Sequence, residues 1–267
     1  MTSGLPLQVD LDVGQGSISV PGSIGASLVE RPASIEEGFS QNCPLVYHYG
    51  HKTPGHNPVL YNQLVSRLAD VVRERLAKNR RAEVSGVVIN TCGWIRGEGY
   101  NQIKHVAQAF EVDVIVVLDQ ERVYTDLVKD MPKFVKVVIQ PKSGGVVSRN
   151  QEQRTESRDT RLKQYFYGPH NNLFPHSFEV SFSEVKDRIY KIGAPELPSS
   201  CLPLGMKVSD SKTKLVSVPL TARELLNYVV AVSFTSCPED VMITNVAGFI
   251  VIPEVRAEEQ KLEEKLH

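Results

Sequence analysis

Apolar residues recur along residues 84–124 with the spacing of a strand, a helix and a second strand. Residues 84–91 and 112–119 are rich in β-branched side chains, and each run has the length of a strand. Between them, apolar residues recur at helical spacing from Ile103 to Phe110. Apolar runs without alternation are typical of parallel strands covered on both faces. The pattern therefore predicts two buried parallel strands joined by a right-handed helical crossover.

Further strands and helices are predicted on either side of this unit. The predicted strands cover residues 5–13, 44–49 and 133–140. The predicted helices cover residues 60–78, 123–131 and 149–167. Polar segments rich in glycine and proline, at residues 17–25 and 50–58, are typical of loops. Alternating strands and helices predict an α/β fold in which helices flank a parallel sheet.

The chain changes character after Gly168-Pro169, which is a typical helix stop. Short β-rich runs separated by proline-rich turns follow, and they predict a smaller β-rich domain. We therefore expect one domain over residues 1–168 and a second over residues 169–267. The glutamate-rich tail, residues 253–267, is predicted to be a frayed helix or the end of a shortened domain.

Amino-acid composition excludes fewer classes of function than the pattern of apolar positions does. The formal charge is −1, so no global charge favours nucleic acid or an anionic membrane, and a basic site would have to be local. No apolar run is long enough to span a bilayer, and the N-terminus lacks a signal pattern, so we expect an intracellular protein with no membrane partner. The four cysteines lie far apart and are expected to be reduced, inert thiols.

Candidate binding residues follow the predicted strands, because ligands of parallel sheets bind beyond the carboxyl ends of the strands. Asp12 ends the first strand, where phosphate-transfer enzymes place a carboxylate that holds magnesium; alternatively it is an ordinary turn acid. Trp94 is the only tryptophan and lies in a glycine-flanked turn after the strand at residues 84–91. Its ring could stack on a base, or it could belong to the core.

Basic residues on the charged helix are a third candidate. Arg149, Arg154, Arg158 and Arg161 follow a glycine loop at residues 143–145, and guanidinium groups match phosphate oxygens. The alternative is a solvated helix face. The three histidines of residues 48–56 match no common zinc pattern, and no full GxGxxG follows a strand. No glycine-rich loop ending in Lys-Ser or Lys-Thr occurs in these 267 residues.

Many separate segments resemble one protein family, in the same order along the chain. They include DVGQG (12–16), RPASIEEGFS (31–40), PLVYHYG (44–50), SGVVINTCGW (85–94), FEVDVIVVLDQERVY (110–124), PKSGGVVSR (141–149), YFYG (165–168), KIGAP (191–195), SCLPLGM (200–206) and VAGFIVI (246–252). The family is the Clp-type polyribonucleotide 5′-hydroxyl kinase, a subunit of the pre-mRNA cleavage machinery that is also linked to tRNA splicing. The resemblance covers most of the chain.

The resemblance implies roles for residues that match the family's motifs. Asp12 would be the Walker B acid near Mg²⁺, and Arg149 and Arg154 would be lid arginines that close on the phosphates of ATP. Thr91, Gly93 and Trp94 match the clasp that grips the RNA end. Gln15 belongs to the same sequence block as Asp12, but it is assigned to the RNA end. The implied fold is a P-loop kinase domain, partial here, followed by a β-rich C-terminal domain.

The resemblance also implies a function. The family moves the γ-phosphate of ATP to the 5′-hydroxyl of RNA in mRNA 3′-end processing and tRNA splicing, which implies a nuclear location. The implied partners are an RNA end, pre-mRNA cleavage factor subunits and the tRNA splicing endonuclease. The family's N-terminal domain and Walker A loop would precede Met1, so we expect this chain alone not to phosphorylate RNA. The alternative function is a non-catalytic scaffold of the cleavage complex.

Overall fold

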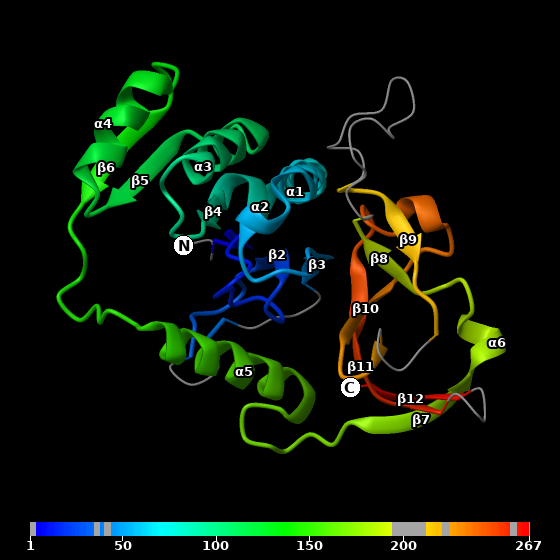
Figure 1. Ribbon diagram of the computed structural model, residues 1–267. Helices are drawn as coiled ribbons and strands as arrows, with labels where there is room; N and C mark the ends of the chain where they lie inside the picture. The colour runs from blue at the N-terminus through cyan, green and yellow to red at the C-terminus, as the bar shows by residue number, and fades with distance from the viewer. Residues whose placement is uncertain are drawn as a thin grey trace.

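The fold places a small central sheet between two layers, with a β-rich part packed beside it (Figure 1). The computed structural model describes residues 4–34, 38–39, 44–193, 212–220, 225–256 and 261–266. The sequence segment 200–206 lies outside these residues, and segments 31–40 and 191–195 lie partly outside them. The mixed α/β class and the smaller β-rich C-terminal part confirm the predicted fold class. The boundary at residue 168 stays a prediction.

The central sheet contains four strands in the order β3-β2-β1-β4. Its strands are β1 (Leu7–Asp10), β2 (Ser23–Leu28), β3 (Leu45–His48) and β4 (Val87–Asn90). β1 and β4 are parallel, with Asp10 opposite Asn90, whereas β2 is antiparallel to both of its neighbours. Residues 23–25, predicted as loop, belong to β2. Gly25 suits this place because a Cβ there would lie 2.6 Å from the Leu45 carbonyl oxygen.

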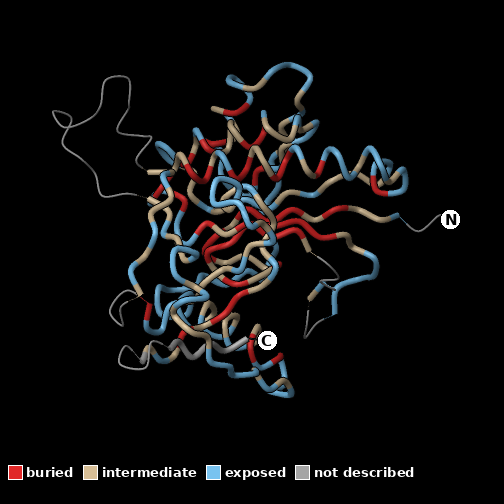
Figure 2. Tube along the Cα trace, turned by 90° about the vertical axis from the view of Figure 1, so that its right-hand side faces the viewer, coloured by how far each residue is buried: buried red, intermediate tan, exposed pale blue. Residues whose placement is uncertain are grey.

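Two helices cover one face of this sheet. α1 (Pro58–Lys78) begins at Asn57, whose side chain accepts a hydrogen bond from the Leu60 amide at 3.2 Å, and Pro58 occupies the first turn. Its apolar face packs on β1, β2 and β3 in the largest core cluster. Figure 2 shows buried positions concentrated in the sheet strands and along this helix. The predicted helix at residues 60–78 is therefore confirmed.

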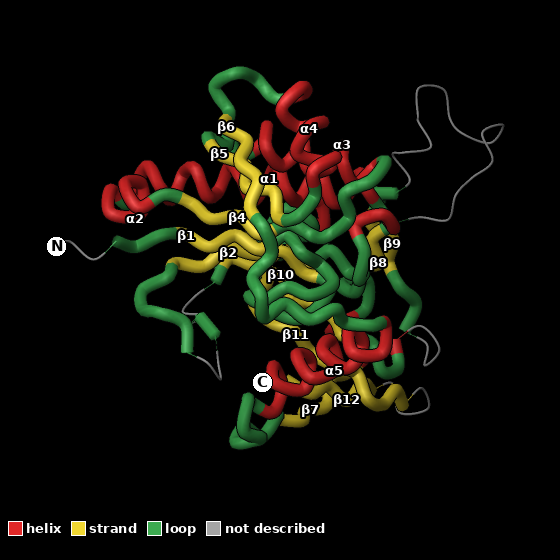
Figure 3. Tube along the Cα trace, turned by 90° about the vertical axis from the view of Figure 1, so that its left-hand side faces the viewer, coloured by secondary structure: helices red, strands yellow, loops and turns green. Residues whose placement is uncertain are grey.

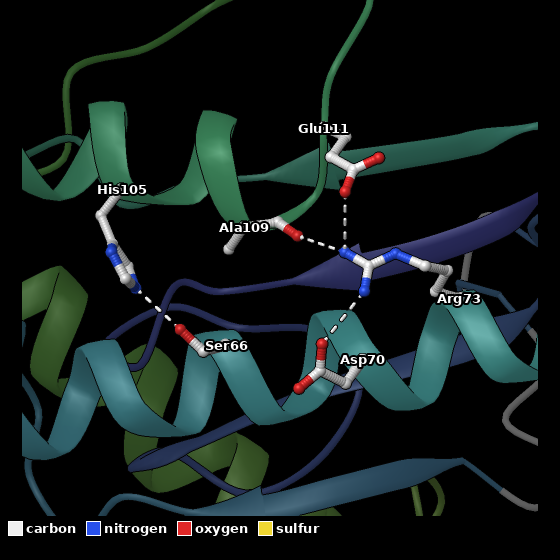
Figure 4. A network of polar contacts seen from close by, with 6 residues as sticks. All are labelled: Ser66, Asp70, Arg73, His105, Ala109 and Glu111. Atoms are coloured by element: carbon white, nitrogen blue, oxygen red, sulfur yellow. Dashed lines mark hydrogen bonds and ion pairs between the residues drawn. The ribbon is translucent and has the colours of Figure 1, made fainter.

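α3 (Glu98–Ala109) packs beside α1, and polar contacts tie the two helices (Figure 4). The His105 ring nitrogen Nε2 lies 3.1 Å from Ser66 Oγ. Farther along, Arg73 contacts Asp70 at 3.1 Å, Glu111 at 3.4 Å and the Ala109 carbonyl oxygen at 3.1 Å. These contacts link α1 to the end of α3.

The strand-turn-helix-strand order of residues 84–124 is confirmed, but two details of the prediction are wrong. Val84 and Ser85 belong to the short helix α2 (Arg80–Ser85), which Asn79 caps and Gly86 ends with a φ of 78°. The next strand, β5 (Val114–Leu118), pairs in parallel with β6 (Lys136–Gln140) and not with β4. α4 (Glu121–Asp130) connects this pair.

β5 also differs from the expected strand covered on both faces. Val114, Val116 and Leu118 are all more than half exposed, whereas Val117 is buried against Val123 and Leu127 of α4. β-branched residues favour a strand whether one face or both are covered, so an unbroken apolar run could not distinguish the two cases. One face of β5 therefore carries an apolar row that the described residues leave open.

α5 (Gln151–Tyr167) and the C-terminal part lie against the other face of the central sheet. Asn150 and Gln153 form a capping box at the start of α5, and Gly168 ends it with a φ of 76°. Phe166 and Phe249 pack with Val46 of β3 in one buried cluster. Figure 3 shows α5 with the C-terminal strands on the side of the sheet opposite α1 and α3.

The C-terminal part contains a four-stranded antiparallel sheet in the order β10-β11-β12-β7. Its strands are β10 (Val229–Ser233), β11 (Val246–Arg256), β12 (Lys261–Leu266) and β7 (His176–Ser181). Outside this sheet, the described residues of the C-terminal part also form the short elements α6 (Phe182–Val185), β8 (Tyr190–Ile192), β9 (Leu215–Ser217) and η3 (Pro238–Asp240). β8 and β9 form a separate antiparallel pair.

The predicted helix in the tail, residues 253–267, is wrong. β11 continues through residue 256, and residues 261–266 form β12 between β11 and β7. The glutamates favour a helix locally, but backbone pairing on both edges of β12 outweighs that preference. The partner strand β7 lies some 85 positions earlier in the chain, so no local pattern could indicate it. Among the described residues, no helix has the length and apolarity needed to cross a bilayer.

The α1 packing predicts the effect of a core substitution. Leu68 is fully buried at the centre of the largest cluster, so Leu68→Ala should lower the free energy of unfolding by about 2–5 kcal/mol. Glu74→Ala on the exposed side of the same helix should change it by less than about 0.5 kcal/mol. Urea titration followed by circular dichroism measures both. Equal effects of the two substitutions would contradict the assigned helix face.

Candidate functional site

The turn after β1 is held by the carboxylate of Asp10. This side chain is only 4% exposed and accepts four hydrogen bonds. Oδ1 accepts from the Asp12 amide at 3.1 Å and from Asn90 Nδ2 at 2.9 Å, and Oδ2 accepts from the Ser17 amide at 2.7 Å and its hydroxyl at 2.9 Å. Asp10 therefore joins β1, β4 and the turn, and its oxygens are already fully used by protein donors.

Asp12 lies in that turn with one oxygen used and one open. Its Oδ1 accepts from the amides of Gly14 at 2.9 Å and Gln15 at 3.0 Å, whereas Oδ2 accepts no hydrogen bond from a described residue. Burial raises the pKa of Asp12, the two amides lower it, Asp10 raises it, and Arg149 lowers it. The open oxygen can accept a water molecule or a cation.

Glycines let two loops meet at this point. A Cβ on Gly14 would lie 2.8 Å from the Lys52 carbonyl oxygen, and a Cβ on Gly16 would lie 2.6 Å from the Asp12 carbonyl oxygen. Larger residues at either position would push the backbone apart. The loop that contains Lys52 therefore lies directly beside the Asp12 turn.

The two arginines of the predicted lid lie at the same edge. The Arg149 guanidinium is near enough to lower the pKa of Asp12, and Gln15 Nε2 donates a hydrogen bond to the Arg154 carbonyl oxygen at 3.1 Å. Figure 1 shows the start of α5 beside the loops that follow β1. The Asp12 turn, Arg149 and the backbone of Arg154 in the first turn of α5 therefore lie at the same sheet edge, and the roles of these residues stay predictions. Arg158 and Arg161 lie farther along α5.

Gln15 holds the turn against α5. Its Nε2 also donates to the Gly14 carbonyl oxygen at 2.9 Å, while its Oε1 is buried and has no hydrogen-bond partner. The sequence assigned Gln15 to the RNA end. Its contacts link the Asp12 turn to the first turn of α5, and the unpartnered oxygen can accept a hydrogen bond, so the assignment to the RNA end stays a prediction.

The turn after β4 reaches the same region through Cys92. The Trp94 amide hydrogen-bonds the Cys92 thiol, and Asp12 is close enough to raise the thiol's pKa, although burial is the larger cause of that rise. Thr91 and Gly93 on either side of Cys92 are exposed. Cys92 was expected to be a reduced, inert thiol, and its place beside Asp12 could not be read from cysteine spacing.

Trp94 is half-buried, which corrects the expectation of an exposed ring and also excludes a fully buried core residue. The far edge of its ring rests on Gly55 in the short helix η1 (Pro54–His56), where a Cβ would lie 2.9 Å from the ring. Its near edge rests on Gly99 at the start of α3, where a Cβ would lie 2.6 Å from Cγ. Two glycines therefore form the seat of the ring.

Two buried tyrosines, which sequence reasoning missed, support the site from below. The Tyr61 hydroxyl on α1 donates to the Leu11 carbonyl oxygen at 3.0 Å. The Tyr49 hydroxyl donates to the Pro54 carbonyl oxygen at 2.8 Å and accepts from the Asn57 amide at 2.9 Å. Burial raises the pKa of Tyr49 to about 12, so its hydroxyl stays protonated as a donor. The sequence could have indicated these residues, because one tyrosine lies on the apolar face of the predicted helix α1 and the other ends the predicted strand β3.

A magnesium ion fits this edge through Asp12. Mg²⁺ keeps several waters and takes one or two protein carboxylates together with phosphate oxygens, and one open carboxylate oxygen satisfies that need. Among the described residues, no group of three or more His, Cys, Asp or Glu side chains is placed to hold a metal by itself. His51 and His56 stack with ring centroids 3.7 Å apart and form no such group.

Two family descriptions match most of the chain. "mRNA cleavage and polyadenylation factor CLP1 P-loop" matches residues 3–168, and "Pre-mRNA cleavage complex II protein Clp1" matches residues 173–263. Together they cover the α/β part with its candidate site and the β-rich part.

Curated relatives are similar over nearly the whole chain. "Polyribonucleotide 5′-hydroxyl-kinase Clp1" of Gallus gallus is 55% identical over 256 residues, which are 96% of this chain and 60% of that protein. "Protein CLP1 homolog" of Anopheles gambiae is 56% identical over 258 residues, with the same two shares. The chain thus spans about 60% of the length of these relatives.

Solved structures share the fold. A chain from a structure titled "Structure of wild-type Clp1p-Pcf11p (454 -563) complex" superposes with a TM-score of 0.82 at 21% identity, covering all of this chain and 64% of that one. A second, titled for the extended interface between Pcf11p and Clp1p and for ATP loss in a point mutant, gives 0.81 at 22% identity and covers 65% of that chain. At this identity the likeness concerns the fold alone.

The raised pKa of Asp12 predicts a pH-dependent stability difference. A carboxyl group with a raised native pKa binds more protons in the folded state, so stability falls as pH rises from about 3.8, the ordinary value, through the raised value. Asp12→Asn keeps an oxygen that accepts from Gly14 and Gln15 but cannot ionise. It should therefore unfold at higher urea concentration than the parent at pH 7, and this difference should vanish near pH 3.

Asp12→Ala is the matched control for that experiment. It also removes the charge, but it loses the acceptor for two backbone amides. We expect it to be less stable than Asp12→Asn at every pH. An Asp12→Asn protein that is less stable than the parent at pH 7 would show that the buried charge is not the main cost at this position.

Proposed function

Because the chain belongs to the Clp1 family of pre-mRNA cleavage complex II proteins, we propose that it is part of a polyribonucleotide 5′-hydroxyl kinase. The reaction moves the γ-phosphate of ATP to the 5′-hydroxyl of RNA. The observation that carries the proposal is the convergence of the Asp12 carboxylate and the Arg149 guanidinium at one sheet edge, beside the turn that holds Trp94. Carboxylate, arginine and an aromatic face are the groups that this reaction uses.

The roles follow from the contacts. Arg149, whose guanidinium lies near Asp12, and Arg154, whose backbone is held by Gln15, would neutralise charge that develops on the transferring phosphate. Bound at the open oxygen of Asp12, magnesium would supply charge neutralisation at the phosphate oxygens. Gly14, Gly16 and Asp10 keep Asp12 in position without touching substrate.

The RNA end would lie against the turn after β4. Thr91 and Gly93 are exposed there, and Trp94 between them and α3 is only partly buried, so a terminal base could stack on its exposed part. Because the ring is seated on Gly55 and Gly99, it is held in one orientation, which lowers the entropy cost of stacking.

We further propose a docking role in the nucleus. The solved relatives are titled as complexes of Clp1p with Pcf11p, which supports cleavage factor subunits as partners of this chain. A role in tRNA splicing, and contact with the splicing endonuclease, follow from the same family and are proposed with it. A non-catalytic scaffold is the second candidate function, and the transfer experiment below separates it from the kinase.

The kinase proposal predicts activity in a chimera. The segment of the Gallus gallus relative that precedes its matched region, joined to this chain, should transfer labelled γ-phosphate from ATP to a 5′-hydroxyl oligoribonucleotide. Arg149→Gln in the chimera should lower the rate by about 10²–10³, the cost of losing one donor that stabilises the transition state. Asp113→Asn, an exposed acid before β5, should leave it unchanged. A folded chimera without transfer would leave the scaffold as the function.

The RNA-clasp proposal can be tested on this chain alone. Trp94→Ala should weaken binding of a fluorescein-labelled 5′-hydroxyl oligoribonucleotide by about five- to a hundredfold, because base stacking contributes about 1–3 kcal/mol. Trp94→Phe should retain most of the affinity. Phe134→Ala, which removes an aromatic ring that is 81% exposed on the loop before β6, serves as control in the anisotropy titration. Equal affinities for all four proteins would remove Trp94 from the binding site.

A further inference from the structure

A separate cavity lies between the end of β3 and the C-terminal part. Its volume is about 330 Å³, near the lower end of the range for small-molecule sites. Its lining is mostly apolar and includes Ile192, Leu215, Val229, Ala231 and Met242. Figure 1 shows β8 and β10 beside β3, the three strands that enclose it. Tyr49, which supports the candidate site from below, also lines this cavity, whereas the residues proposed to bind ATP, magnesium or RNA do not.

His48 gives the wall of the cavity an unused polar atom. The side chain lies at the end of β3, its ring meets Phe249 edge to face at 5.7 Å, and burial lowers its pKa to about 4. Its Nδ1 is buried and has no hydrogen-bond partner. A buried polar nitrogen without a partner lowers stability, and a ligand that hydrogen-bonds to it would offset that loss.

The rim of the cavity carries positive charge. Lys191 on β8 is exposed and makes no ion pair with a described residue. His51 also lines the cavity, and its pKa is lowered by burial first, then by the neighbouring His56 and by Lys191. Lys191 therefore contributes a positive charge to the same cavity as the His51 ring. Apolar walls with a cation at the mouth favour a ligand that has an apolar body and one negatively charged group.

We propose that this cavity binds a small organic anion. The apolar body of the anion would lie between β3, β8 and β10, with the His48 ring facing the ligand, and its carboxylate would contact Lys191. The ligand would join the central sheet to the C-terminal part, because the two parts contribute opposite walls. No residue proposed to take part in phosphoryl transfer lines this cavity, so a test of ligand binding here does not test the kinase proposal. A loosely packed crevice between the two parts is the competing explanation.

The probe is 2-naphthoate, a flat apolar body with one carboxylate, and 2-naphthamide is its uncharged counterpart. In isothermal titration calorimetry with this chain, naphthoate should bind at one saturable site, and the amide should bind about fivefold more weakly. The imidazole signals of His48 should shift on naphthoate addition in an NMR titration. Absence of saturable naphthoate binding overturns the proposal in favour of the crevice.

Two pairs of variants locate the binding. Lys191→Gln should lower naphthoate affinity about fivefold without changing that of the amide, whereas Lys186→Gln, an exposed lysine outside the cavity, should change neither. Ala231→Leu should fill the cavity and abolish binding of both compounds. Val232→Leu is its control, because this neighbouring residue on β10 does not line the cavity.

Each outcome of the variant series supports or overturns the proposal. An unchanged naphthoate affinity in Lys191→Gln overturns the anion assignment, and this exposed substitution is not expected to disturb folding. Binding that survives Ala231→Leu places the ligand elsewhere, for example on the open face of β5. Circular dichroism shows whether Ala231→Leu remains folded. If it does not, the Lys191 pair alone decides between the anion site and the crevice.

Discussion

The buried carboxylate of Asp10 is the constraint on which the candidate site depends. A carboxylate that is almost wholly buried must have its oxygens satisfied, and here the donors come from three segments: the turn itself, Ser17 and Asn90. Because Asn90 ends β4, the bond fixes the ends of the two parallel strands beside each other. The turn with Asp12 and the turn with Trp94 begin at those two strand ends.

Local pattern predicted most of the elements but few of their pairings. α1 was predictable because its apolar face and its cap at Asn57 are both local features. The partner of β5 was not, because an apolar strand carries no mark of which neighbour it pairs with. The sequence prediction missed the strand β12 for a related reason. Its glutamates favour a helix, and the backbone partners that make it a strand lie in β11 and in the distant β7.

The site was predictable where a residue type implied a role at a strand end. Asp12, the glycines around it, Arg149 before α5 and Arg154 in its first turn belong to that class, and the structure places them at one sheet edge. Tyr61, Tyr49 and Cys92 were missed because their importance comes from what their atoms meet, such as the Leu11 carbonyl oxygen, and not from their spacing. The sequence also could not show that Trp94 is half-buried, because its burial depends on contacts with Gly55 and Gly99.

The β-rich part is tied to the candidate site through α5. At one end of this helix, Gln15 donates to the Arg154 carbonyl oxygen; at the other, the Tyr165 hydroxyl accepts from the Phe249 amide of β11 at 3.0 Å. β11 also packs on β3 through Phe249 and Val46, and the Val46 amide donates to Asn245 at 2.6 Å. A rigid helix held at both ends must move as a unit. The placement of the start of α5 beside the Asp12 turn, with Arg149 before the helix and Arg154 in its first turn, therefore depends on contacts made in the C-terminal part as well as on the turn itself.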